Sequence, residues 1–240
     1  MPPYDRFSRF YDQVMGDRAD AANYIRDLIE HHHPRAKTLL EIACGTGGIL
    51  GRLSESYDVT GLDRSRPMLA IARARLPHIR LFRQDMTGFH IDRRFDAIVC
   101  AFDSINHLRR FSDWKQTFRC VAGHLNSGGV FVFDVNTIGK LNRLVEGPPW
   151  VAQFGRDLVV IRVTSGRAGV FAWDVKIFEH RKRDDYKLIA ETIEETAFAM
   201  QRILTALRAC FIEVKVFDPE GARPSDRSER LYFVCKARAK

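Results

Sequence analysis

The chain has 240 residues, of which 45% are hydrophobic and 28% charged, with 16 glycines and 9 prolines; this balance excludes collagen-like, low-complexity and disordered classes. A chain this long buries roughly 70 to 75% of the surface that its unfolded form exposes, so it needs neither disulfides nor a structural metal to hold a core. The formal net charge is +8, and residues 64–119 hold 12 basic against 5 acidic residues. Because these arginines are scattered and lack interleaved surface aromatics, they favour a solvated surface over a nucleic-acid binding surface.

The first part of the chain predicts two helices followed by a doubly wound α/β core. Apolar residues recur at helical spacing in residues 6–15 and 19–32, with Gly16 between them and Pro34 after them. From Lys37 onward, short apolar runs alternate with amphipathic segments, as in parallel sheets that helices cover on both faces. The predicted strands are 38–43, 59–62, 79–82, 97–102 and 130–135, and the predicted helices are 48–54, 66–75 and 111–125.

The pattern changes after Asn136. Longer strands are predicted at 158–164, 170–180 and 186–196, where apolar and polar residues alternate as in an antiparallel sheet with one buried face. A helix at 199–209 and strands at 211–217 and 231–235 complete the core. We therefore expect three parts: a helical cap (1–34), an α/β core (35–137 and 199–240) and an antiparallel β insertion (138–198) over an acceptor site.

A glycine turn follows the first core strand in residues 39–48. Such a turn lets backbone N–H groups approach a ligand closely. As a dinucleotide fingerprint, Gly45 and Gly47 would require a third glycine where Leu50 stands. Glu41, near the strand end, would repel a pyrophosphate and suits a cationic ligand group instead.

Three more blocks follow at strand ends. Asp63 ends the second strand, 18 residues beyond Gly45, where an acid can accept hydrogen bonds from both ribose hydroxyls. After the third strand, Asp85 could accept from an adenine amino group and Met86 could lie on the ring. The fourth strand occupies residues 95–102.

From about Thr38 to Thr137, these four blocks resemble the class I S-adenosylmethionine-dependent methyltransferases in order and spacing. The resemblance implies a seven-stranded sheet whose last strand is antiparallel, with S-adenosylmethionine lying across the strand ends. The glycine loop would hold the methionine part, Asp63 the ribose, and Asp85, Met86 and Ala101 the adenine surroundings. The cofactor-binding residues expected are Tyr11, Arg18, Glu41, Ala43, Cys44, Gly45, Thr46, Gly47, Asp63, Arg64, Met68, Asp85, Met86 and Ala101.

Two short motifs outside these blocks carry a closer resemblance. Tyr11-Asp12-x5-Arg18, together with residues 102–108, looks like the small-molecule methyltransferases that include the macrolide amino-sugar N-methyltransferases. This implies that Tyr11 and Arg18 contact the methionine end of the cofactor and that His107 faces the acceptor. The alternative interpretations are helix packing with a solvated charge for the first pair, and a histidine that caps a turn for His107.

Several other chemistries do not fit. The Asn/Asp-Pro-Pro-Tyr motif of nucleic-acid amino-methylation is absent after the fourth strand, and neither Cys44 nor Cys100 is placed as a thiol nucleophile. The spacing of Asp103 and residues 134–136 does not match a catechol-type Mg²⁺ site, and His31 to His33 lack partners at metal spacing. We predict no metal.

We predict a soluble, cytoplasmic protein with reduced thiols that is monomeric or homodimeric. The five cysteines are scattered, the start does not resemble a leader, and no apolar run approaches the ~20 residues of a membrane helix.

The predicted function is methyl transfer from S-adenosylmethionine to nitrogen, or oxygen, of a small-molecule acceptor. His107 is the first candidate base, because an unperturbed pKa near ~6.5 leaves it largely neutral, and Asp103 and Asp134 are second. The insertion favours an enclosed amine, since residues 151–196 balance 8 basic with 8 acidic residues. The alternatives are an RNA methyltransferase that uses residues 64–119 and a non-catalytic protein that binds the cofactor.

Overall fold

The computed structural model describes Tyr4, residues 6–166 and residues 169–239, and its centre is a seven-stranded sheet in the order β10-β11-β5-β4-β1-β2-β3. Strands β1 to β5 pair in parallel, whereas β11 runs antiparallel to both β5 and β10. The predicted doubly wound sheet with an antiparallel last strand is confirmed. The strands are β1 (Thr38–Ile42), β2 (Asp58–Asp63), β3 (Arg80–Arg83), β4 (Phe95–Cys100), β5 (Leu125–Asn136), β10 (Glu213–Phe217) and β11 (Arg230–Lys236).

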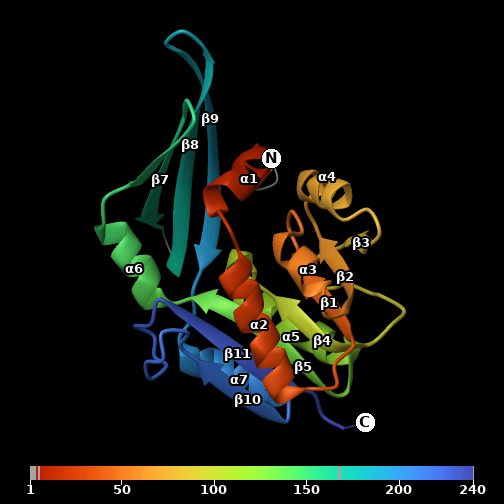
Figure 1. Cartoon of the computed structure of the whole chain (residues 1–240). Coiled ribbons are helices and arrows are strands. Elements are labelled where there is room, and N and C mark those ends of the chain that lie inside the picture. The colour runs from red at the N-terminus through yellow and green to blue at the C-terminus, as the bar shows by residue number, and fades with distance from the viewer. Residues whose placement is uncertain (1–3, 5, 167–168, 240) are drawn as a thin grey trace.

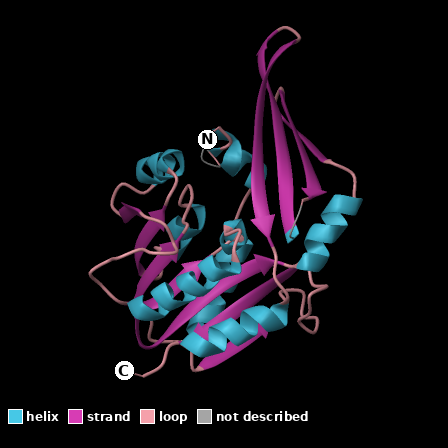
Figure 2. Cartoon of the chain, turned by 180° about the vertical axis from the view of Figure 1, so that it is seen from behind, coloured by secondary structure: helices cyan, strands magenta, loops and turns pink. Residues whose placement is uncertain are grey.

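Helices cover both faces of this sheet, because its central strands are apolar on both sides. In β5, Phe131 and Phe133 pack with Trp114 and Phe118 on the face of α5 and α7, which is the face seen in Figure 2. The alternate residues of β5, including Val132, pack on the opposite face. There the covering helices are α2 (Ala19–His32), α3 (Gly48–Leu53) and α4 (Arg66–Arg75), and on the first face they are α5 (Phe111–His124) and α7 (Met200–Cys210).

The insertion between β5 and α7 forms a second, antiparallel sheet in the order β6-β7-β8-β9, which projects beyond the core (Figure 1). The prediction of three strands here was incomplete, because it missed one helix and the first strand. The helix buries only Leu141, and the strand lies at the sheet edge with Trp150 45% exposed, so neither shows a clear pattern of burial in the sequence. The elements are α6 (Ile138–Glu146), β6 (Trp150–Phe154), β7 (Asp157–Ser165), β8 (Val170–Lys182) and β9 (Asp185–Thr196).

The N-terminal helix α1 (Ser8–Met15) packs against the second sheet and lies beside β9 (Figure 1). Phe7 and Phe10 share an apolar cluster with Val159, Val175 and Ile177 of that sheet. The carboxylate of Glu191 on β9 accepts hydrogen bonds from the backbone N–H groups of residues 6 and 7. The insertion therefore fixes the position of helix α1. The helix lies over the edge of the core sheet at which β1, β2 and β4 end. No helix within the described part of the chain is long and apolar enough to cross a membrane.

Candidate active site

The loop between β1 and α3 is a tight turn built on left-handed backbone. Ala43, Gly45 and Gly47 have positive φ angles of 56°, 54° and 78°. A Cβ on Gly45 would meet no atom within 4 Å, whereas one on Gly47 would lie 2.7 Å from Leu76 Cδ1. Gly45 thus leaves open space above the loop, and Gly47 lets the loop pack closely against the end of α4.

Asp63, at the end of β2, is fixed by the backbone. Its Oδ2 accepts from Gly45 N at 2.9 Å and its Oδ1 accepts from Ser65 N at 2.7 Å. Burial raises the pKa of this carboxyl, and the two backbone hydrogen bonds offset part of that shift. Each carboxylate oxygen keeps a further lone-pair direction, so the side chain can accept two hydroxyl groups from a ligand in the cavity it lines.

A cavity lies over these residues. The residues of its wall that the sequence predicted are Tyr11, Ala43, Gly45, Asp63, Arg64, Met68, Asp85, Met86 and His107. Those that the prediction missed are Tyr4, Leu62, Ser65, Gln84, Phe102, Ser104 and Leu108. Most of the missed residues adjoin predicted ones in the chain, but no sequence pattern pointed to Tyr4.

Eight predicted residues lie outside this wall: Arg18, Glu41, Cys44, Thr46, Gly47, Ala101, Asp103 and Asp134. Arg18 is 7% exposed, donates to Asp12 Oδ1 at 2.8 Å and lies 4.8 Å over the Tyr11 ring. Thr46 Oγ1 donates to the same oxygen of Asp12 at 2.6 Å. Arg18 therefore stabilises the glycine loop, through Asp12, and the Tyr11 ring from outside the cavity wall.

Glu41 also lies behind the loop, at 3% exposure. Burial raises its pKa well above the usual value, although the charge of Arg18 opposes the shift. Its Oε2 has no hydrogen-bond partner among the described residues. A cationic ligand group near the loop would favour the ionised form of this buried carboxyl.

His107 lies in the short 3₁₀ helix η1 (Ser104–His107) after β4 and is held on both ring nitrogens. Nδ1 is 3.1 Å from the carbonyl oxygen of Glu194, and Nε2 is 2.8 Å from Tyr4 Oη. A carbonyl only accepts, so the proton is assigned to Nδ1 and Nε2 accepts from the tyrosine hydroxyl. Burial lowers the pKa of His107 and raises that of Tyr4, which keeps this neutral pair intact. The basic nitrogen of His107 thus orients Tyr4.

Asp103 and Asp134 share one arginine. Arg230 donates to Asp103 Oδ1 at 2.7 Å and forms an ion pair with Asp134 Oδ2, which also accepts from Asp103 N at 2.9 Å. Burial opposes ionisation of Asp103, but the charges of Arg230, Lys140 and His107 and the hydrogen bond from Arg230 together outweigh burial and lower the pKa of Asp103. Burial raises the pKa of Asp134, which is 1% exposed. Asp134 therefore anchors Arg230, whereas Asp103 reaches a second cavity.

This second cavity, of about 630 Å³, lies between α1, the end of β5 and the inner face of the second sheet. It shares Tyr4, Tyr11 and Phe102 with the first cavity. Its remaining wall residues are Phe7, Met15, Asp103, Asn136, Lys140, Ile161, Trp173, Val175, Ile193, Glu195 and Arg230. The two cavities therefore meet at three aromatic side chains.

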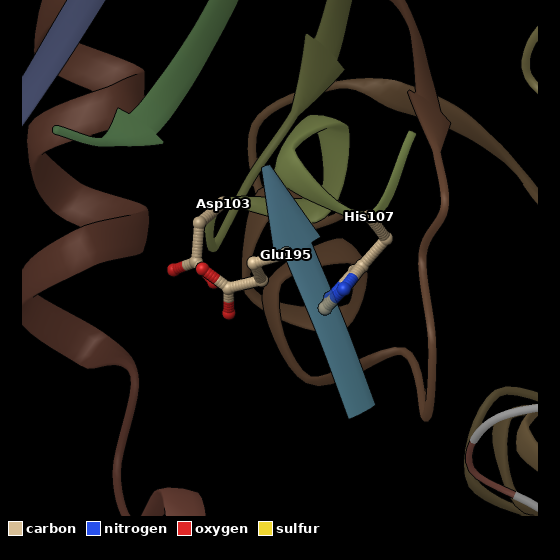
Figure 3. A group of neighbouring side chains, drawn as sticks. All are labelled: Asp103, His107 and Glu195. Atoms are coloured by element: carbon tan, nitrogen blue, oxygen red, sulfur yellow. The ribbon is translucent and has the colours of Figure 1, made fainter. Parts of the chain in front are cut away.

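Three side chains come together at this junction: Asp103 just before η1, His107 in η1 and Glu195 in β9 (Figure 3). One potential ligand atom of each lies within 4.8 Å of the others. A metal ion there would have to compete with Arg230 for Asp103 and with Tyr4 and Glu194 for the imidazole. Asp103 and His107 are therefore already bound by the protein's own groups.

Comparison with known proteins identifies related sequences. A family model described as a methyltransferase domain matches residues 39–129. The chain is 30% identical to "Putative methyltransferase YqeM" of Bacillus subtilis (strain 168) over 242 residues, which cover 97% of this chain and 96% of that protein. It is 37% identical over 131 residues to dTDP-3-amino-3,4,6-trideoxy-alpha-D-glucopyranose N,N-dimethyltransferase of Streptomyces venezuelae, and this match spans 54% of this chain and 55% of the relative.

Solved structures share the whole fold. The sugar N-methyltransferase KedS8 from Streptoalloteichus sp. ATCC 53650 superposes with a TM-score of 0.82 at 26% identity, covering 99% of this chain and 94% of KedS8. An S-adenosylmethionine-dependent methyltransferase from Clostridium acetobutylicum ATCC 824 gives a TM-score of 0.84 at 24% identity, covering 98% and 99% of the two chains. The core sheet, the cap and the insertion thus recur together.

Proposed function

Because the chain belongs to the class I S-adenosylmethionine-dependent methyltransferases, we propose that it transfers the methyl group to a nitrogen atom of a small molecule bound in the second cavity. The observation that carries this proposal is the meeting of the two cavities at Tyr4, Tyr11 and Phe102. One cavity suits the cofactor and the other an acceptor, so the reacting groups can meet without crossing bulk water. Nitrogen is favoured over oxygen because relatives of this chain are named as sugar N-methyltransferases.

The residues of the first cavity fit S-adenosylmethionine. Asp63 has free acceptor capacity and backbone-fixed geometry for the two ribose hydroxyls. Asp85 offers a carboxylate for the adenine amino group, and Met68 and Met86 line the same cavity with apolar side chains. The amide of Gln84 is hydrogen-bonded to the backbone of His90. The cofactor's ammonium group would approach the glycine loop, behind which Glu41 supplies a buried carboxyl.

S-adenosylmethionine, when bound, supplies an electrophilic methyl group on a positively charged sulfur. Because that charge disappears during transfer, the protein has to position, desolvate and deprotonate the acceptor rather than bind a developing anion. His107 holds the Tyr4 hydroxyl by accepting its proton in a hydrogen bond, and the hydroxyl oxygen keeps lone pairs for a polar hydrogen of the acceptor. His107 acts on the acceptor through Tyr4, as a positioning residue.

The charge distribution supports a small acceptor rather than RNA. Several arginines of the basic segment are paired with carboxylates: Arg64 with Asp85, Arg75 with Asp12, Arg93 with Asp58 and Arg109 with Glu194. Paired arginines have less charge to offer a phosphate backbone. The second cavity is also lined by apolar and aromatic side chains from the insertion and α1, as in pockets that enclose small ligands.

A transfer assay with S-adenosylmethionine labelled in the methyl group tests the proposal. The protein is incubated with a panel of small amines and alcohols in parallel with total RNA, and label is counted in each fraction. We expect label in small amines and little in RNA. Robust labelling of RNA that weakens steeply with salt, without labelling of any small molecule, would overturn the proposed acceptor class.

A further inference from the structure

Glu195 is a buried carboxyl group that borders the second cavity. It lies near the end of β9, is 4% exposed, and lines the cavity together with Asp103. Among the described residues its carboxyl receives one hydrogen bond, from Asn136 Nδ2 to Oε2 at 2.9 Å. The other oxygen, Oε1, is left for an occupant of the cavity.

Two cations, Arg230 and Lys140, line the same cavity, but neither forms an ion pair with Glu195. Arg230 pairs with Asp103 and Asp134, and Lys140 Nζ donates to Asn136 Oδ1 at 2.8 Å. No described cation forms an ion pair with Glu195. Burial raises the pKa of Glu195 well above its usual value, and the facing charge of Asp103 raises it further, while Lys140 and Arg230 offset only part of the shift.

The part of the cavity wall that the second sheet forms beside this carboxyl is mainly apolar. Ile161, Val175 and Ile193 line the cavity from the second sheet, and Trp173 adds an aromatic surface. A carboxyl group at the end of an apolar pocket is complementary to a ligand with an apolar body and one cationic group, because an opposite charge within about 4 to 6 Å favours the ionised form.

We propose that Glu195 binds the amino group of the acceptor, so that the enzyme selects amines that enter as ammonium ions on a compact apolar body. This inference rests on the proposed function, and it assigns the substrate class and the residue that recognises it. The carboxyl of Glu195 lies within 4.8 Å of the ligand atom of His107, which in turn holds Tyr4 at the junction of the cavities. An amine bound there lies next to the place where the cofactor's methyl group is expected.

The proton balance follows from this arrangement. An ammonium ion that enters the cavity pairs with the carboxylate of Glu195. The ammonium then transfers one proton to Glu195, which leaves a neutral amine with a free lone pair. That lone pair forms the nitrogen–carbon bond as the carbon–sulfur bond breaks with its electrons going to sulfur. The product leaves as a methylated ammonium ion, and Glu195 releases its proton to solvent.

A binding experiment without methyl transfer tests this recognition. The protein, saturated with S-adenosylhomocysteine, is titrated at pH 7 with cyclohexylamine, cyclohexanol and cyclohexanecarboxylate, which share one apolar body. Binding is followed by the fluorescence of Trp173, with a Trp173→Phe variant as the blank. We expect the amine to bind at least ~10-fold more tightly than the other two compounds.

Glu195→Gln should abolish the preference for the amine, because glutamine keeps the hydrogen bond from Asn136 but cannot ionise. Glu195→Asp should keep part of this preference. The matched control is Asp174→Asn, an acid-to-amide change on the outer face of the same sheet, where Asp174 accepts from Thr192 Oγ1. It should behave as the wild type, and unchanged affinity for S-adenosylhomocysteine shows that each variant is folded.

Two results would overturn the inference: equal affinity of the wild type for amine and alcohol, or full amine preference in Glu195→Gln. Because no methyl is transferred in this experiment, either result concerns Glu195 alone. Failure of the proposed function would show instead as absence of label from every small molecule in the transfer assay, even where the amine binds as expected.

Discussion

Replacement of Asp63 by alanine tests the assignment of the cofactor cavity most directly. The carboxylate accepts from Gly45 N and Ser65 N at 2.9 and 2.7 Å, and in the proposed complex it also accepts from the ribose hydroxyls. A hydrogen bond to a charged group contributes about 1.5 to 3 kcal/mol. Loss of one net contribution of this size raises the Kd for S-adenosylhomocysteine about 10- to 150-fold.

The backbone contacts of Asp63 complicate this comparison, because alanine also leaves the Gly45 and Ser65 amides without their acceptor. Calorimetric titration of wild type and variant with S-adenosylhomocysteine and its 2′-deoxy analogue separates the two effects. If Asp63 holds the ribose, removing the 2′-hydroxyl weakens binding to the wild type but changes little in Asp63→Ala. An equal loss in both proteins would show that Asp63 only shapes the loop and would refute the ribose assignment.

Three further predictions concern the junction of the cavities. Tyr4→Phe and His107→Ala should lower kcat by similar factors, because His107 acts through the tyrosine hydroxyl. The factor for His107→Ala should be on the order of 10², with little change in cofactor affinity, and a wild-type kcat from pH 6 to 9 in either variant would contradict this. Arg230→Met should lower the free energy of unfolding by about 3 to 5 kcal/mol, measured with urea, since it leaves two buried carboxylates unpaired; an unchanged midpoint would contradict that pairing. Burial lowers the pKa of folded His107, so the unfolded chain binds the proton more readily and stability should fall as the pH drops below about 6.5; urea titrations should show this component in the wild type and not in His107→Ala.

The strands of the core could be predicted from the sequence because the apolar patterns that mark them involve residues close together in the chain. Continuous apolar runs such as 130–135 predict strands buried on both faces, and β5 buries Phe131 and Val132 on opposite sides of the sheet. Asp63 was found in the same way, since parallel strands bring their carboxyl ends to one edge, and the structure places it against Gly45. Neighbours in the chain therefore sufficed for most of the first cavity.

The second cavity had no comparable signal. Its charged and amide side chains come from Asp103, just before η1, and from β5, α6, β9 and β11, and only folding brings them together. Arg230 meets Asp134 across 96 positions, and Tyr4 meets His107 across 103. The sequence suggested Asp103 and Asp134 as alternative bases, without indicating that one arginine binds both.

The sequence by itself thus determined the parallel sheet, the glycine loop and the acid that faces it, because hydrophobic periodicity and strand-end spacing depend on residues close together in the chain. Tertiary structure alone decided which buried carboxyls are paired and which are not. Desolvation and partner charges set that property, and both depend on distances between segments far apart in sequence. For this reason Glu195, in a strand that the sequence did predict, became a candidate only once its surroundings on β5, α6 and η1 were known.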